Sequence, residues 1–280
     1  MRIINTKELV PIISKLCQKA SYELDYNLLN GYKKALEKAD TPIGKKIIKI
    51  LIENAEYAKK MQIPCCQDTG ITVVFMEIGK EISWEGDPLV KTVNEGVRRG
   101  YLSGFLRISV IKDPINRINT GDNTPAVLHT EIVEGDKVKI VVIPKGFGSE
   151  NQNQLKMLTP ADGIEGFINF VKDSVKKGAG KSCPPLVIGI GIGGTTEKSA
   201  LLAKKALLRK IGQRNKNKVI AELEERILSE VNDLGIGPLG LGGKTTALDV
   251  FIEEFATHIA GFPVAVNLQC HSNRHDSVII

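Results

Sequence analysis

Residues Pro184 to Gly194 read PPLVIGIGIGG, and this stretch indicates the fold class more clearly than any other. An apolar run that ends in glycines is typical of a buried strand that leads into a loop. The two segments that follow, EKSALLAKKALLRKIG (197–212) and NKVIAELEERILSEVNDLG (217–235), have the apolar period of helices. A strand, a glycine loop and two helices in this order predict an α/β fold.

The rest of the chain extends this pattern in both directions. Helical periods occupy about the first 60 residues, and PPLVIGIGIGG is followed further on by a glycine loop, GIGPLGLGGKT (235–245). The whole predicts one mixed α/β domain over residues 1–280, with a helical N-terminal region and small β-sheets flanked by helices. The other expected elements are a strand at 71–79, a helix at 87–102, a hairpin within 126–146, a helix opened by Thr159-Pro160, a helix at 246–261 that contains His258, and a closing strand at 262–270.

The composition is that of an ordinary globular protein, with 42% hydrophobic and 25% charged residues. No apolar run is long enough to cross a bilayer, and the first residues, MRIINTKELV, do not resemble a signal peptide, so we expect a cytoplasmic protein without membrane contact. The net charge of +6 is spread along the chain among acidic residues, as in EKADTPIGKKIIK. That pattern argues against a nucleic-acid partner and suits a small anionic substrate.

Two glycine motifs resemble nucleotide-binding loops. Gly189 to Gly194 satisfies G-x-G-x-x-G, but a dinucleotide site also needs an acidic residue after a second strand, and the region in question reads RKIGQRNKNK. GLGGKTT resembles a phosphate loop, but Pro238 stands where that motif needs its first glycine. A nicotinamide-dependent dehydrogenase is therefore a third-ranked interpretation, and both loops can still present backbone N–H groups to an anion.

The chain has five cysteines, an odd number without a secretion signal, which favours reduced thiols or metal ligands over disulfides. Cys66, Cys183 and Cys270 are too far apart for a ferredoxin run or a zinc ribbon. Each stands beside a glycine, a proline or a polar turn at the edge of an apolar run. From spacing and setting alone, buried and inert thiols are favoured over metal ligands.

The residues around these cysteines resemble class I fumarases, and more narrowly the α subunits of two-subunit fumarases and L-tartrate dehydratases. The resemblance runs from about Ile50 to the end of the chain, with the motifs in the family's order. The motifs that carry it are Cys66-Gln-Asp-Thr-Gly70, Asn119-Thr-Gly-Asp-Asn-Thr-Pro-Ala126, Lys145-Gly-Phe-Gly-Ser149, the glycine stretch from Cys183 to Gly194, and Cys270-His271.

The resemblance implies a [4Fe–4S] cluster held by Cys66, Cys183 and Cys270, with one iron that has no protein ligand. Such an open iron acts as a Lewis acid on a substrate hydroxyl, which suits the addition or removal of water. It also implies oxygen sensitivity. Cys65 lies outside the CQDTG motif, and Cys17 is on the apolar face of a helix, where a core position is expected.

Five further residues are implied by the same resemblance. Gln67 and Asp68 match residues that contact substrate, and Asp68 matches a proposed proton donor, although an aspartate in a turn often caps its own backbone. Arg107 matches an arginine that binds a substrate carboxylate, and a surface ion pair is the alternative. Gly148 would place backbone near substrate, or be a plain turn glycine. His258 matches an active-site histidine, or a histidine that complements a helix dipole.

Single-chain members of the family carry a second domain that this sequence lacks after Cys270. The resemblance therefore implies a separate β subunit that completes the active site, in an α2β2 hetero-oligomer, with the chain as the α subunit of a hydro-lyase. The expected reaction is the reversible hydration of fumarate to (S)-malate, and the alternative within the family is an L(+)-tartrate dehydratase that gives oxaloacetate. The alternative from another class is a zinc-stabilised binding or scaffold protein, which would need a closed tetrahedral ligand set.

Overall fold

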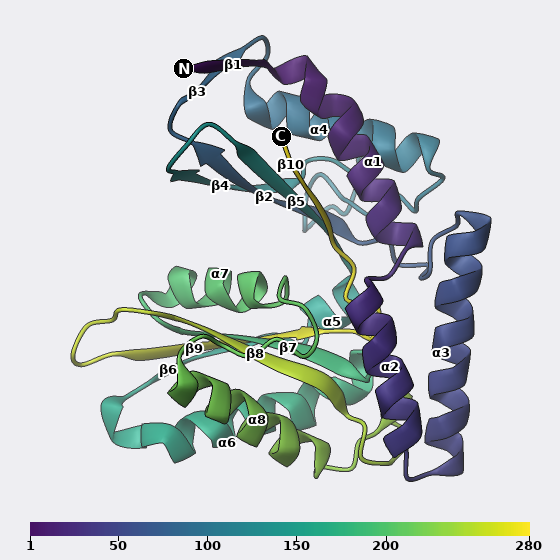
Figure 1. Cartoon of the computed structure of the whole chain (residues 1–280), viewed down its shortest axis with the longest axis vertical. Coiled ribbons are helices and arrows are strands. Elements are labelled where there is room, and N and C mark those ends of the chain that lie inside the picture. Colours follow the sequence, from purple (N-terminus) through teal and green to yellow (C-terminus); the bar gives the residue numbers. More distant parts are fainter. The chain divides into compact units, whose positions relative to one another are not determined.

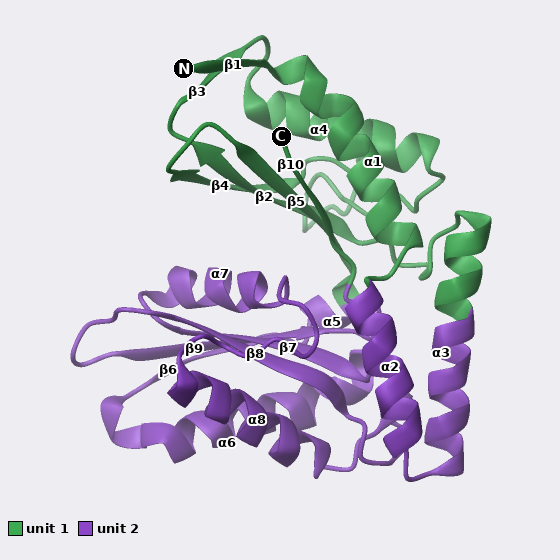
Figure 2. Ribbon diagram, viewed as in Figure 1, with its two compact units in different colours: residues 1–25, 54–147, 274–280 green, residues 26–53, 148–273 purple.

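The computed structural model describes all 280 residues, and they form two compact units (Figures 1 and 2). Both units are built from segments that are distant in the sequence. Helix α3 contributes residues to both units. Unit 1 comprises residues 1–25, 54–147 and 274–280, and unit 2 comprises residues 26–53 and 148–273.

Unit 1 contains a four-stranded sheet of order β10-β5-β2-β4 and a two-stranded sheet of β1 and β3. Strand β2 pairs in parallel with β4 and antiparallel with β5. The C-terminal strand β10 returns to this unit and pairs with β5. The elements are β1 (Arg2–Asn5), α1 (Leu9–Tyr22), the second half of α3 (Pro42–Met61), β2 (Ile71–Gly79), β3 (Ile82–Glu85), α4 (Leu89–Ser103), β4 (Val127–Val133), β5 (Val138–Lys145) and β10 (Asp276–Ile279).

The core of unit 1 lies between this sheet and helices α1 and α4, which run parallel to each other. The predicted apolar face of α1 is buried, and Cys17 is fully buried as expected. Helix α4 approaches α1 closely because Gly96 and Gly100 have no side chain. A Cβ at Gly96 would lie 2.7 Å from Ile13, and one at Gly100 would lie 2.9 Å from the carbonyl oxygen of Ser14. Larger residues at these two positions would separate the helices.

Unit 2 is a four-stranded sheet of order β6-β9-β7-β8, covered by α6 and α8 on one face and by α7 on the other (Figure 1). Its glycine-rich strand β7 lets α7 lie directly on the sheet, because a Cβ at Gly189 or Gly191 would meet the backbone of α7 at 2.1 or 2.0 Å. The elements are α2 (Tyr26–Lys38), the first half of α3, α5 (Phe147–Glu150, at the junction with unit 1), β6 (Gln154–Leu158), α6 (Gly163–Gly178), β7 (Leu186–Gly193), α7 (Thr196–Ala206), α8 (Lys218–Asn232), β8 (Ala247–Phe255) and β9 (Phe262–Gln269), with 3-10 turns at Thr6–Glu8, Pro160–Asp162, Ala179–Lys181 and Pro238–Gly240.

The mixed α/β class, the N-terminal helices and the small sheets flanked by helices are confirmed. The strand at 186–193, the two helices after it and the strands at 71–79 and 262–269 are also confirmed. The assignment of residues 1–280 to one cluster-binding domain stays a prediction. No helix of the chain is both long and apolar enough to span a membrane.

The helix expected at 246–261 is wrong. Residues Ala247–Phe255 form strand β8, which pairs in parallel with β7, and His258 lies in the loop after the strand instead of near a helix end. The run Val250 to Ile252 is fully buried, as β-branched and aromatic residues in a central sheet often are. The reading of His258 as a residue that complements a helix dipole is therefore excluded.

The hairpin expected within 126–146 is also wrong. Both strands exist as β4 and β5, and the connection turns at Gly135, whose φ is +97°. The two strands do not pair with each other, because β2 lies between them. The end of β2 fills the turn, where Gly79 donates its N–H to the carbonyl oxygen of Lys137 at 2.8 Å.

Candidate active site

In unit 1, the loop Cys66 to Gly70 connects α3 to β2 and is held by hydrogen bonds from the surrounding elements. Tyr101 of α4, which is fully buried, donates its hydroxyl to the carbonyl oxygen of Thr69 at 2.7 Å. Gly70 has a φ of +71°, and a Cβ there would lie 2.3 Å from the carbonyl oxygen of Lys145. Only glycine fits this position, so the CQDTG loop packs directly on the start of the KGFGS motif.

Asp68 is half-buried, and its carboxylate accepts two backbone N–H groups, from Gly70 at 2.9 Å and from Phe147 at 2.8 Å. A Cβ at Gly146 would lie 3.1 Å from the Asp68 carboxylate, so this glycine allows the close approach. Arg274, which is 1% exposed, donates to the carbonyl oxygen of Asp68 at 2.7 Å. The backbone-capping role considered for Asp68 is therefore present, and a carboxylate with two such bonds still has unused lone pairs.

Arg107 lies in the irregular segment after α4, and its side chain is exposed. Its carbonyl oxygen accepts a hydrogen bond of 2.8 Å from the hydroxyl of Thr69, which brings Arg107 next to the loop that carries Gln67 and Asp68. The guanidinium forms no ion pair within unit 1, so the surface ion pair considered as an alternative is not formed. Gln67 is exposed as well. Unit 1 thus gathers Cys66, Gln67, Asp68 and Arg107.

In unit 2, Cys183 precedes β7 and Cys270 follows β9, and the antiparallel pairing of these strands brings the two cysteines to one edge of the sheet. The N–H of His271 donates to the carbonyl oxygen of Cys183 at 3.1 Å, so the two segments are in direct contact. Cys183 is exposed and has a φ of +53°, which is uncommon for a residue other than glycine. Cys270 is half-buried, with its sulfur 3.1 Å from the hydroxyl of Ser272.

Gly148 lies near the same edge, because a Cβ there would stand 3.7 Å from the carbonyl oxygen of Lys181. Nothing in the chain itself requires a glycine at this position. His258 is at the opposite edge. It is exposed, its Nδ1 accepts the N–H of Ala260 at 3.2 Å, and neighbouring Thr257 bonds to Gly194 after the far end of β7. Eight strand residues rise about 3.3 Å each, so His258 is about 20 Å or more from Cys183.

The five cysteines differ in how well their thiols could act as metal ligands. None of the five forms a disulfide. Burial raises the pKa of the Cys17 thiol to about 12, so this cysteine stays protonated and inert. Cys66, Cys183 and Cys270 all reach the surface, and thiolates are the ligands of iron–sulfur clusters. No group of three or more His, Cys, Asp or Glu side chains is arranged to hold a metal ion, so neither unit alone offers the closed four-ligand set of structural zinc.

Comparison with known proteins decides the family. Residues 10–279 match the sequence model of the fumarate hydratase (Fumerase) family. The chain belongs to this family of hydro-lyases. It is 44% identical to "Putative L(+)-tartrate dehydratase subunit alpha" of Methanocaldococcus jannaschii, over 94% of each chain. It is 31% identical to the α subunit of L(+)-tartrate dehydratase from Escherichia coli O157:H7 and to that from strain K12, over 98% of this chain and 91% of theirs.

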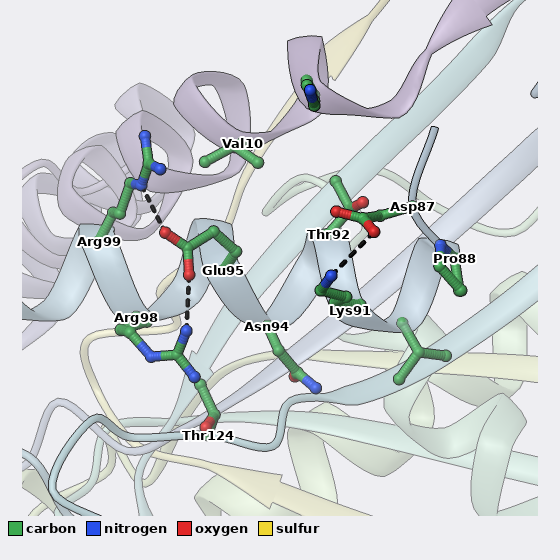
Figure 3. A pocket seen from close by; sticks show the side chains of 12 residues that line it. Val10, Asp87, Pro88, Lys91, Thr92, Asn94, Glu95, Arg98, Arg99 and Thr124 are labelled. Carbon is green, nitrogen blue, oxygen red and sulfur yellow. Dashed lines mark hydrogen bonds and ion pairs between the residues drawn. The ribbon is translucent and has the colours of Figure 1, made fainter. Parts of the chain in front are cut away.

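A separate cavity of about 870 Å³ in unit 1 is lined mainly by α4 and the residues just before it, with Lys7, Val10 and Thr124 (Figure 3). None of the predicted site residues lines it. Three of its four basic side chains form ion pairs, since Glu95 bonds to Arg98 and Arg99, each at 2.6 Å, and Lys91 pairs with Asp87 at 2.8 Å. Arg98 and Arg99 hold the pKa of Glu95 below its usual value. We therefore do not place the active site in this cavity.

Four residues around the predicted site carried no role in the sequence interpretation: Tyr101, Asn123, Lys145 and Arg274. All four are buried, and three of them are shown to bond to the CQDTG loop. Asn123 and Lys145 belong to motifs that carried the family resemblance, and this signal could have marked them. Tyr101 sits within a helical pattern and Arg274 in the last turn of the chain, where neither spacing nor composition distinguishes them.

Proposed function

We propose that this chain is the α subunit of a [4Fe–4S]-dependent hydro-lyase that reversibly hydrates fumarate to (S)-malate. The observation that carries the proposal is the contact between the Cys183 and Cys270 segments, both with thiols that reach the surface, in a chain of the fumarate hydratase family. Two cysteines so distant in the sequence meet only because β7 and β9 pair. Buried, inert thiols would not need this arrangement.

Cys66, Cys183 and Cys270 are the residues that would hold the cluster. Bound there, it would supply a Lewis acid for the substrate hydroxyl and one carboxylate. Cys65 is left out of the proposed ligand set because it lies outside the CQDTG motif, and its side chain is buried. Cys17 is left out as well because it is fully buried in the core of unit 1.

The other residues of unit 1 bind and orient the dicarboxylate. The Arg107 guanidinium is exposed and suits a bidentate contact with one substrate carboxylate. Gln67 would donate its amide to substrate, and Asp68 would exchange a proton with it. The two N–H bonds to the Asp68 carboxylate fix its orientation while one face remains accessible. Gly148 would leave room for substrate beside its backbone. The catalytic role expected of His258 stays a prediction, which its distance from Cys183 does not favour.

A separate β subunit would complete the active site, in an α2β2 assembly. The relatives of this chain are themselves named α subunits, and the chain spans 94% and 91% of two of them. The proposal therefore predicts that the purified chain binds iron but turns over little substrate until the β subunit is added. Full activity of the chain alone would contradict the need for a partner.

A second candidate reaction is the dehydration of L(+)-tartrate to oxaloacetate. The names of the relatives favour it, at 44% and 31% identity. Malate and tartrate differ by one hydroxyl, and Arg107 would bind a carboxylate of either. The test is steady-state kinetics of the anaerobically reconstituted pair with fumarate, (S)-malate and L(+)-tartrate as substrates. A higher kcat/KM for fumarate and malate supports the first reaction, a higher value for tartrate supports the second, and no turnover of any contradicts both.

A further inference from the structure

The side chain of Asn123 forms three hydrogen bonds next to the predicted substrate residues. The residue is fully buried, and its backbone has a φ of +60°. Its side-chain oxygen accepts the N–H groups of Ser109 at 2.7 Å and Val110 at 3.2 Å. Its side-chain nitrogen donates to the carbonyl oxygen of Gly70 at 3.1 Å. One amide group therefore connects the end of the CQDTG loop to the segment that follows Arg107.

A second bond joins the same two segments. The hydroxyl of Thr69 donates to the carbonyl oxygen of Arg107 at 2.8 Å. Residues 105–110 belong to no helix or strand, so their position depends on bonds of this kind. The Thr69 bond is to Arg107 itself, and the Asn123 bonds are to the residues two and three positions after it. Together they attach this segment to the residues directly after Asp68.

We propose that Asn123 is a positioning residue, which fixes the Arg107 guanidinium relative to the Asp68 carboxylate so that both contact one dicarboxylate. The inference rests on the proposed function, because it needs Arg107 to bind a substrate carboxylate. Arg107 is exposed and forms no ion pair in unit 1. The position of its guanidinium therefore depends on where these bonds hold its backbone. A small shift of an orienting group has a large effect on binding and rate.

The decisive variant is Asn123→Asp, which keeps the acceptor for Ser109 and Val110 and replaces the donor to Gly70 with an oxygen. The matched control is Asn94→Asp. The side-chain oxygen of Asn94 also bonds to the Asn119–Ala126 motif, where it accepts the N–H of Ala126 at 2.9 Å. Asn94 has no hydrogen bond to Gly70 or to the Arg107 segment. Thr69→Val removes the other bond, and Thr69→Ser keeps the hydroxyl and should restore the wild-type behaviour. The Thr69 pair decides the question if Asn123→Asp does not fold.

The measurements are KM and kcat of the reconstituted α and β pair, and the Kd of succinate, a dicarboxylate that cannot be hydrated. We expect Asn123→Asp and Thr69→Val to raise KM and the succinate Kd about tenfold, the effect of one lost hydrogen bond in a buried site, with kcat changed by less than about threefold. Asn94→Asp and Thr69→Ser should match the wild type.

A double-mutant cycle separates positioning from a general structural effect. If Asn123 acts through Arg107, Asn123→Asp should raise KM little further in an Arg107→Lys background. Unchanged KM and Kd in Asn123→Asp and Thr69→Val, or additive effects with Arg107→Lys, would overturn the inference. A wild-type pair that neither turns over nor binds any dicarboxylate would instead overturn the proposed function, so the two failures are distinguishable.

Discussion

The two units hold their cysteine-bearing segments with different proportions of side-chain and backbone hydrogen bonds. In unit 1, the loop after Cys66 is held by buried side chains, those of Tyr101 and Asn123, and by the Asp68 carboxylate. In unit 2, backbone groups connect the Cys183 and Cys270 segments to each other and to their neighbours, and the buried Tyr32 adds a side-chain bond from its hydroxyl to the carbonyl oxygen of His271. His271 donates its N–H to Cys183, Asn273 donates to Cys270, and Leu239 donates to Pro184, over 2.8 to 3.1 Å.

This difference predicts different tolerance to substitution. A side-chain bond is lost when its residue changes, and the buried partner is left unsatisfied at a cost of about 1–3 kcal/mol. A backbone bond survives most substitutions except proline. The Cys66 loop should therefore be sensitive to several residues that are distant from it in the sequence, whereas the Cys183 and Cys270 segments should tolerate changes in most neighbouring side chains, with Tyr32 as the exception.

The largest effect is expected for Asn123→Ala in unit 1. It leaves two N–H groups and one carbonyl oxygen without their partner, so we expect a loss of about 3 kcal/mol in the free energy of unfolding, measured by urea titration. Hydrogen exchange should become faster at Ser109 and Val110. A loss below about 1 kcal/mol would show that the side chain of Asn123 does not hold these segments.

A smaller loss is expected for Tyr101→Phe. The ring stays in the core, and the hydroxyl loses its bond to the carbonyl oxygen of Thr69, at 2.7 Å, and a longer one to that of Gly70, at 3.4 Å. One such buried bond is worth about 1–1.5 kcal/mol, which thermal and urea unfolding can resolve. If the phenylalanine variant is as stable as the wild type, the 2.7 Å bond does not contribute to holding the loop.

In unit 2, Ser272→Ala is the matched substitution, since Ser272 is fully buried and its hydroxyl lies 3.1 Å from the Cys270 sulfur. Sulfur is a weak hydrogen-bond partner, so we expect a loss below about 1 kcal/mol by urea unfolding. A loss as large as that of Asn123→Ala would end the contrast between the two units.

The smallest effect on stability is expected for Gly148→Ala. A Cβ at this position meets only the carbonyl oxygen of Lys181, at 3.7 Å, and the residue is in a short helix, where alanine is favoured by about 1 kcal/mol. The melting temperature should be unchanged or slightly higher, whereas KM for the dicarboxylate should rise if the backbone lies against substrate. Wild-type kinetics would assign Gly148 to a plain turn.

The sequence predicts best what local patterns determine. The apolar run at Leu186–Gly193 and the helices after it form as expected, because strand length, glycines and helical period agree. Strand β8 was missed because the run Ala247–Phe255 also fits one face of a helix. Its pairing with β7 is a contact over some 60 residues, and periodicity carries no information about such partners. Asp249 within it is buried against Arg214 and the N–H of Gly212, which no local pattern shows.

The same limit applies to the strands of unit 1 and to the site. The turn at Gly135 exists as predicted, but β2 separates the two strands that it joins. Cysteine spacing alone does not predict that Cys183 and Cys270 lie close together, and only the motifs of the family resemblance assigned them to one site. Asp68 and Arg107 were likewise named by motif, whereas the bonds that link their segments run through Thr69 and Asn123, which only the fold brings together.

The most direct test of the central claim is the iron and sulfide content of single cysteine-to-serine variants after anaerobic reconstitution. The account predicts about four irons in the wild type, as a [4Fe–4S] cluster requires, and in Cys65→Ser and Cys17→Ser. Cys66→Ser, Cys183→Ser and Cys270→Ser should each lose the brown colour and most of the iron while keeping the wild-type circular dichroism. Wild-type iron in any of these three variants, or zinc in place of iron in the wild type, would contradict a cluster held by these thiolates.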